Sequence, residues 1–261
     1  ILFPSAGREA SDFNELSSRL NIEGYPVWLM QHPGIDGAVS SVAAPSLMDL
    51  GDDASQLVAR APGQPVLLGH AFGNRLARAT AVRSSGKASG IILLAAGGLK
   101  PIPKRANKAL FNSFRADIPA GDHQEAVRYG FFADGNDIPD YWLRGWHGGT
   151  AQMQGRAVAK TEADDWWAAD GLPMLVVTVL EDRIAPPEDT VDLNQESVKW
   201  LADQYSGRII YLSTCSVYGA QEGLLDETSP VNPLSVYAAT KLAAEEYLRD
   251  RNAIIFRLGT L

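Results

Sequence analysis

Apolar residues in the first hundred positions alternate between short continuous runs and runs with helical spacing. Apolar side chains around Leu16, Leu57 and Leu76 recur every three to four residues, which predicts helices with one buried face. Strands that alternate with helices at this spacing predict a mainly parallel sheet covered on both faces. The continuous runs that predict its buried strands lie at 1–3, 25–30, 65–68 and 91–94.

Residues 100–167 break this alternation, because they favour helix but are interrupted by Gly and Pro. Such a segment predicts either a lid of helices over a pocket or a small helical insertion whose aromatic side chains fill its own core. These aromatic residues are Phe111, Phe114, Phe131, Phe132, Trp142, Trp146, Trp166 and Trp167.

The alternation returns with a buried strand at 174–179, a helix near 198–201 and a strand at 208–212. We therefore predict an α/β fold: a three-layer, mostly parallel sheet with helices on both faces and a helical lid insertion. The expected division is a core at 1–99, the insertion at 100–168, and a continuation of the sheet at 169–261.

Charge and cysteine content narrow the function classes. The chain has 261 residues and a formal net charge of -8, which argues against non-specific binding to nucleic acid or anionic membrane. One cysteine, Cys215, excludes an intrachain disulfide and suits a reducing compartment, so we expect a cytoplasmic protein. No run of residues predicts a membrane helix or a signal segment, and the start at Ile1 indicates a longer parent protein.

The first two-thirds of the chain is organised around residues 65–74, PVLLGHAFGN. The pattern predicts a strand, then a tight turn between Gly69 and Gly73, and then a helix. The G-x-S-x-G nucleophile elbow occurs in this context. The glycines allow a strained turn to pass close to its neighbours. The central residue is Ala71 rather than Ser, and a methyl group cannot attack a carbonyl.

Four features in order resemble the α/β-hydrolase family over about residues 1–188: PSAG at 4–7, HPG at 32–34, the elbow, and LEDRIAPP at 180–187. The resemblance places the catalytic acid at Asp182. It places the oxyanion hole at the backbone N–H groups of Phe72 and Ala6. Two such donors aimed at a developing oxyanion are usually the largest catalytic contribution in these enzymes.

Two departures from the family pattern concern the nucleophile and the base. Position 71 is Ala, and no histidine follows Asp182, where the family has its general base. The resemblance therefore implies a protein derived from a carboxylic-ester or acyl hydrolase, with impaired catalysis. His70 beside the elbow and His147 in the insertion are alternative bases, each set against a purely packing role.

The last seventy residues carry a different pattern. The run STCSVYG at 213–219 follows a predicted strand, and NPLSVYAATK occupies 232–241. Tyr237 and Lys241 are four residues apart and lie on one helical face. A nearby ammonium favours the phenolate, which makes a tyrosine usable for proton transfer.

This stretch, from about residue 190, resembles the extended short-chain dehydrogenase/reductase family, the nucleotide-sugar epimerases and dehydratases. The resemblance implies that Thr214 hydrogen-bonds substrate, that Tyr237 is the acid/base, and that Lys241 tunes Tyr237 and holds the nicotinamide ribose. The family's glycine-rich NAD turn is missing, since residues 5–10 have one glycine in the three expected places. We therefore expect no cofactor, with NAD as the alternative.

The sequence thus predicts a join of two families, with a seam near 187–194. Three hypotheses follow: a hydrolase-derived protein that binds a small-molecule ester or acyl ligand, an NAD(P)-dependent epimerase or reductase, or a chimeric or designed scaffold without evolved activity. All three exclude nucleic-acid and membrane partners, and all leave the oligomeric state open.

Overall fold

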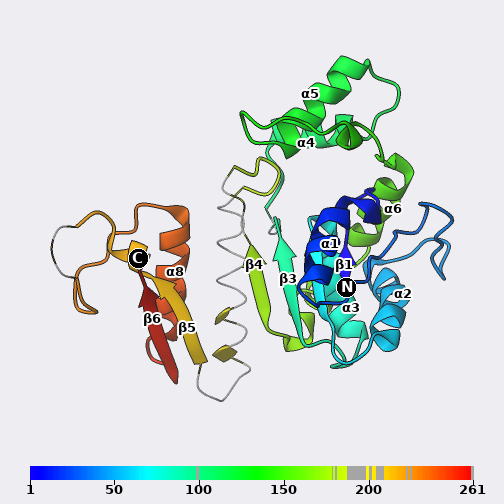
Figure 1. Ribbon diagram of the computed structural model, residues 1–261. Helices are drawn as coiled ribbons and strands as arrows, with labels where there is room; N and C mark the ends of the chain where they lie inside the picture. Colours follow the sequence, from blue (N-terminus) through cyan, green and yellow to red (C-terminus); the bar gives the residue numbers. More distant parts are fainter. Residues whose placement is uncertain are drawn as a thin grey trace. The chain divides into compact units, whose positions relative to one another are not determined.

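The computed structural model describes residues 1–261 except 98–99, 178, 180, 187–197, 200–201, 204–208, 222, 224 and 260–261, and except the side chains of 210, 212 and 236. The chain divides into two compact units, Ile1–Pro186 and Pro187–Leu261. Figure 1 shows the elements of each unit, which are described separately below.

A parallel sheet forms the centre of the first unit. Its strands lie in the order β1-β2-β3-β4. Leu2 also bridges Leu29, so the strand predicted at 25–30 is reduced to a single bridge beside the two-residue β1. The strand bounds are β1 Leu2–Phe3, β2 Val66–His70, β3 Gly90–Leu94 and β4 Met174–Val177.

Helices cover both faces of this sheet, as the alternation predicts. On one face, Leu2, Leu68 and Ile92 pack with Phe13 and Leu16 of the segment that follows β1. That segment consists of the 3₁₀ helix η1 (Ala10–Phe13) and α1 (Asn14–Ile22). The other face carries α3 (Phe72–Arg83), against which α2 (Leu47–Arg60) packs.

The N-terminal ends of these helices differ from one another. Ser46 and Asp49 form a reciprocal capping box at the start of α2. Serine favours the N-cap position of helices, so Ser11 is a candidate cap for the first helix. The structure does not use it as a cap: Ser11 lies inside η1, and its hydroxyl donates a hydrogen bond to the Glu9 carboxylate.

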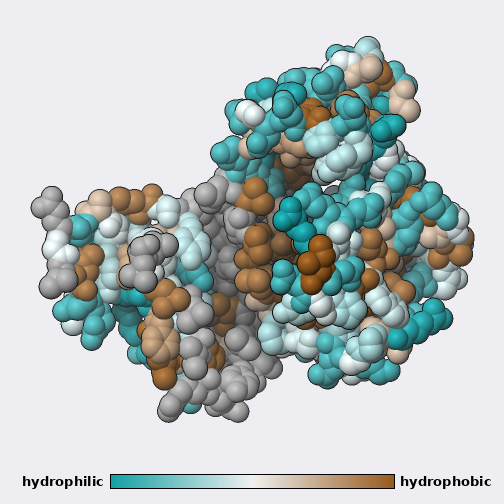
Figure 2. Space-filling view, viewed as in Figure 1, coloured by the Kyte–Doolittle hydropathy of each residue, from teal (hydrophilic) through white to brown (hydrophobic). Residues whose placement is uncertain are grey.

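A helical insertion stands between β3 and β4, and α4 and α5 lie side by side within it (Figure 1). Its visible face is mostly hydrophilic (Figure 2), whereas Phe131, Trp142 and Trp146 pack on one another. Whether it acts as a lid stays a prediction. Its helices are α4 Lys104–Ser113, α5 Ala120–Phe131, η2 Asp140–Leu143, α6 Gly148–Ala159, η3 Ala163–Asp165 and η4 Ala169–Gly171.

In the second unit the parallel strands β5 (Ile209–Thr214) and β6 (Ala253–Leu258) pair with each other. Between them come the 3₁₀ helix η5 (Cys215–Tyr218) and α8 (Val236–Leu248). The predicted three-part division of the chain and the continuation of one sheet through 169–261 stay predictions. The predicted seam lies outside the described residues.

None of the described helices is both long enough and apolar enough to cross a membrane. The cytoplasmic location stays a prediction.

Candidate functional site

The turn between β2 and α3 has the geometry of a nucleophile elbow with alanine at its tip. Ala71 has φ 51° and ψ -111°, a left-handed conformation that strains any residue with a side chain. A Cβ on Gly73 would lie 2.0 Å from the Phe3 carbonyl oxygen, and one on Gly69 would lie 2.2 Å from the Gly73 carbonyl oxygen. Both glycines are therefore required for the chain to pass this turn.

Hydrogen bonds donated to β3 hold the turn in place. The Ala71 N–H donates to the Leu94 carbonyl at 3.2 Å, and the Asn74 side-chain amide donates to the same oxygen at 2.8 Å. The tip of the elbow is therefore fixed to the end of the neighbouring strand.

The loop after β1 runs along the first turn of α3. Besides the Phe3 contact, a Cβ on Gly73 would lie 2.7 Å from the Pro4 carbonyl oxygen. This contact brings the segments of the two predicted oxyanion donors, Ala6 and Phe72, next to each other. That their N–H groups bind a ligand stays a prediction.

His32 ties this loop to the elbow. Its Nε2 lies 3.1 Å from the Pro4 carbonyl oxygen and 3.2 Å from that of Ser5, so we assign the proton to Nε2. Its ring meets the Phe72 ring edge-on at 5.6 Å. Because the side chain is fully buried, desolvation lowers the pKa of His32 to about 4. A buried neutral imidazole is thus part of the loop's support.

We expect the first unit to lose stability between pH 6.5 and pH 4. In this range the unfolded chain takes up a proton on His32 and the folded chain does not, so the free energy of unfolding falls as the pH falls. The shift corresponds to about 3 kcal/mol. Urea unfolding at pH 7 and pH 4.5 measures this difference, and His32→Gln should remove it. An equal pH-dependent loss in wild type and His32→Gln would contradict the assignment, and His123→Gln is the matched control.

Asp182, the predicted acid, lies in the loop after β4. Its Oδ1 accepts the N–H groups of Ile184 and Ala185, each at 2.8 Å. Because β2, β3 and β4 are parallel neighbours, Asp182 and Ala71 both follow strand ends at the same edge of the sheet. The role of Asp182 as an acid stays a prediction.

Arg183, which follows Asp182 in the chain, contacts the insertion. Its Nη2 lies 2.8 Å from the Asp134 carboxylate, and its Nη1 donates to two carbonyl groups at the end of α5. Arg183 therefore ties the Asp182 loop to the insertion.

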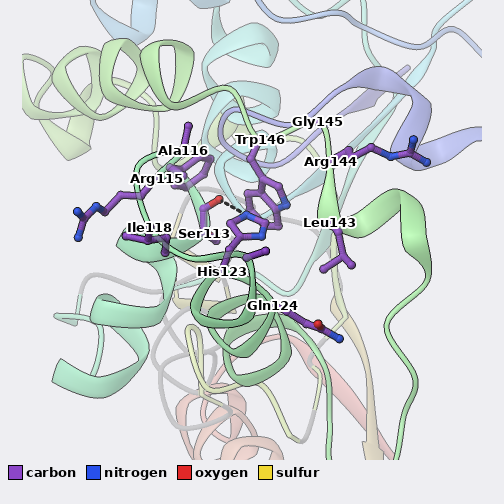
Figure 3. Close-up of a pocket in the computed structure, with 12 residues that line it drawn as sticks. Ser113, Arg115, Ala116, Ile118, His123, Gln124, Leu143, Arg144, Gly145 and Trp146 are labelled. Carbon is purple, nitrogen blue, oxygen red and sulfur yellow. Dashed lines mark hydrogen bonds between the residues drawn. The ribbon is translucent and has the colours of Figure 1, made fainter.

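A pocket of about 550 Å³ lies within the insertion, between α4, α5 and the segment at 143–146 (Figure 3). Its apolar lining comes from Phe114, Ile118, Leu143 and Trp146. A Cβ on Gly7 would lie 2.8 Å from the Phe114 ring, so one wall of the pocket touches the β1 loop. The Phe114 side of the pocket therefore lies against the loop that carries the predicted oxyanion donor Ala6.

Arg8 joins the β1 loop to the insertion. Its guanidinium lies 2.7 Å from the Asp12 carboxylate and donates to the Arg144 carbonyl at 2.6 Å. The same group stacks on the rings of Trp142 and Trp146, with centroid distances of 4.7 and 4.4 Å. This buried cation fixes the insertion segment against the loop.

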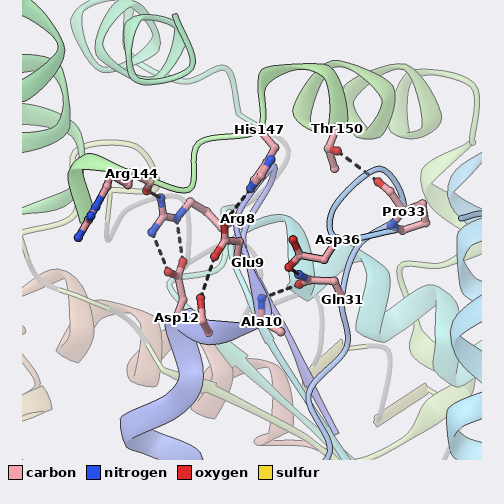
Figure 4. Close-up of polar contacts among 11 residues, drawn as sticks. Arg8, Glu9, Ala10, Asp12, Gln31, Pro33, Asp36, Arg144, His147 and Thr150 are labelled. Carbon is pink, nitrogen blue, oxygen red and sulfur yellow. Dashed lines mark hydrogen bonds and ion pairs between the residues drawn. The ribbon is translucent and has the colours of Figure 1, made fainter. Parts of the chain in front are cut away.

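Glu9 and His147 form a hydrogen-bonded pair across the same junction (Figure 4). His147 Nε2 lies 2.9 Å from Glu9 Oε1, and the two side chains are 34% and 32% exposed. The hydrogen bond from His147 is the largest of the influences that lower the pKa of the Glu9 carboxyl. The His147 backbone N–H also donates to the Gly7 carbonyl at 2.9 Å. The sequence marks His147 but gives no signal for Glu9, because the two positions are 138 residues apart.

His70, the other alternative base, has a different environment. Desolvation by burial lowers its pKa, and the nearby Asp12 carboxylate opposes this shift. We therefore expect a neutral His70 at pH 7.

In the second unit, the predicted residues Tyr237 and Lys241 lie near each other. Lys241 Nζ lies 5.8 Å from the Tyr237 ring centroid and 4.9 Å from that of Tyr211 on β5. Burial lowers the Lys241 pKa. Tyr237 is 52% exposed, and the Thr214 hydroxyl accepts the Ser216 N–H at 3.2 Å. Their roles toward a substrate stay predictions.

Among the described residues, no group of three or more His, Cys, Asp or Glu side chains lies close enough together to hold a metal ion.

Two family models match the chain. The alpha/beta hydrolase family matches residues 1–215, and the NAD dependent epimerase/dehydratase family matches residues 178–260. The two matches overlap at 178–215, around the predicted seam.

Solved structures give the same fold. A hydrolase from Pseudomonas aeruginosa is 16% identical with a TM-score of 0.57, and the match covers 75% of this chain and 76% of that one. An esterase from Exiguobacterium antarcticum is 16% identical with a TM-score of 0.58, and the match covers 75% and 79%. A probable hydrolytic enzyme from Pseudomonas aeruginosa is 14% identical with a TM-score of 0.56, and the match covers 98% and 76%.

Proposed function

We propose that this chain, which belongs to the α/β hydrolase family, derives from a carboxylic-ester or acyl hydrolase and now binds such a ligand while hydrolysing it slowly. The observation that carries the proposal is the elbow with Ala71 at its tip. Its strained backbone and close-packed glycines are retained, but the side chain cannot form an acyl intermediate.

The proposed ligand is a small ester or acyl compound. The pocket beside Gly7 is lined in part by Phe114, Leu143 and Trp146, which suits an apolar acyl chain. The N–H groups of Ala6 and Phe72 would receive the carbonyl oxygen. Binding of this kind requires neither a cofactor nor a metal ion.

Slow catalysis follows from the missing groups. Without a serine at position 71 there is no covalent intermediate, and no histidine follows Asp182 in the chain. Oxyanion donors alone still accelerate acyl transfer, because they stabilise the charge that develops on the carbonyl oxygen.

Ala71→Ser tests the proposal. We expect kcat/KM for a p-nitrophenyl ester to rise by about ten-fold or more, because the substitution restores the nucleophile at the elbow. An acyl adduct at position 71 should appear in the intact mass. Ala71→Gly is the matched control, since it tolerates the same backbone conformation and adds no hydroxyl. If Ala71→Ser gives neither hydrolysis nor an adduct, the proposal is wrong.

An NAD(P)-dependent epimerase or reductase is the second candidate. The family match at 178–260 and the position of Lys241 beside Tyr237 favour it. The absence of the glycine-rich turn from the sequence argues against it. Saturable NAD binding would favour this candidate. Cooperative unfolding without ligand binding would favour a chimeric or designed scaffold.

A further inference from the structure

We infer that His147, oriented by Glu9, is the general base for acyl transfer at this elbow. The inference rests on the proposed hydrolase function and supplies the group that the chain lacks after Asp182. A catalytic histidine needs a carboxylate on one ring nitrogen and an available lone pair on the other. Glu9 occupies Nε2 of His147, and the described residues provide no partner for Nδ1.

The carboxylate is held in place on both of its oxygens. Glu9 Oε1 accepts from His147, and Glu9 Oε2 accepts the Ser11 hydroxyl at 3.1 Å. A Cβ on Gly145 would lie 3.2 Å from Oε1, and Gly145 has φ 71°. A larger residue at position 145 would crowd the Glu9 carboxylate. The glycine backbone therefore helps to position the Glu9–His147 pair.

His147 is attached to the loop that carries the predicted oxyanion donor. Its N–H binds the Gly7 carbonyl, and a Cβ on Gly7 would lie 2.7 Å from the His147 carbonyl oxygen. Three residues earlier in the same loop, the Pro4 carbonyl packs on Gly73, two positions beyond Ala71. The base, the oxyanion segment and the elbow are thus linked by direct contacts within one unit.

The other three histidines lie in different environments. His32 Nε2 binds two backbone carbonyls and its side chain is fully buried. His123 Nε2 lies 3.0 Å from the Ser113 carbonyl oxygen in the pocket wall. His70 lies at the end of β2 and is desolvated. Only His147 combines partial exposure with a hydrogen-bonded carboxylate.

The proposed reaction is an acyl transfer in which His147 accepts a proton and later returns it. His147 Nδ1 takes a proton from water, or from a serine hydroxyl placed at position 71, as the oxygen bonds to the acyl carbon. The carbonyl π electrons move to its oxygen. Collapse of this adduct breaks the ester C–O bond, and the leaving alkoxide takes the proton from the imidazolium.

The experiment compares variants in the Ala71→Ser background. His147→Gln should lower kcat by about 10²-fold or more and remove the limb of the pH–rate profile that rises through imidazole titration. Glu9→Gln should lower kcat and displace that limb. Four charged groups surround the His147 imidazole. They are Glu9 and Arg8 from the β1 loop, Asp12, which binds Arg8, and Arg144, whose carbonyl accepts from Arg8. Glu15→Gln is the matched control for Glu9→Gln, because Glu15 is 81% exposed on α1 and pairs with Arg19; it should leave kcat within about two-fold.

Two further measurements separate catalysis from structural support. Added imidazole should restore the rate of His147→Gly, because a free base can enter the space, whereas a structural role would give no rescue. If Ala71→Ser is active and His147→Gln keeps its rate and pH profile, the dyad is overturned and the hydrolase proposal stands. If Ala71→Ser itself forms no acyl adduct, the hydrolase proposal fails.

Discussion

Gly73→Ala is expected to lower the free energy of unfolding of the first unit by about 3 kcal/mol or more. The new methyl group would lie 2.0 Å from the Phe3 carbonyl oxygen and 2.7 Å from that of Pro4. Both contacts are to backbone, so rotation of a side chain cannot relieve them. Either the β1 loop or the first turn of α3 must move.

Gly155→Ala is the matched control for this substitution. Gly155 lies inside α6, and nothing lies within 4 Å of the Cβ that it would gain. The control should stabilise the protein by up to about 1 kcal/mol, because alanine favours helix over glycine. Urea unfolding measures both changes, and a loss of less than about 1 kcal/mol in Gly73→Ala would contradict the close approach.

Glu245→Ala is expected to destabilise the second unit by about 3–5 kcal/mol. Glu245 is 4% exposed, and its carboxylate lies 2.6 Å from Arg257 Nη2, with a second hydrogen bond of 2.9 Å from Arg257 Nε. Ser213 donates to the same carboxylate, and Arg257 also donates to the Tyr218 hydroxyl at 2.9 Å. The substitution leaves a largely buried guanidinium on β6 without its carboxylate.

Hydrogen exchange of the α8 amides is the appropriate measurement, because it reports on this unit alone. Glu15→Ala is the matched control, since the Arg19–Glu15 pair is 76% and 81% exposed and contributes less than about 1 kcal/mol. The double substitution Glu245→Leu/Arg257→Met should recover much of the loss. Equal protection of α8 in wild type and Glu245→Ala would show that the pair does not hold this unit together.

Several features were predictable because they depend on residues close together in the chain. The apolar periodicity gives the strands and helices of the first unit, and the spacing of Gly69, Ala71 and Gly73 gives the elbow. The second resemblance depends on Tyr237 and Lys241, which share one helical turn. The strand at 25–30 failed as a local prediction, since its length depends on how many residues of β1 are available for pairing.

Thus the sequence by itself determined the fold class, the two family resemblances and the presence of alanine at the tip of the elbow. Only the tertiary structure decided that Glu9 meets His147, that Arg8 stacks on Trp142 and Trp146, and that His32 supports the β1 loop. These contacts join positions far apart in the chain. Periodicity and turn chemistry act over a few residues, so they cannot specify which residues of the insertion contact the β1 loop.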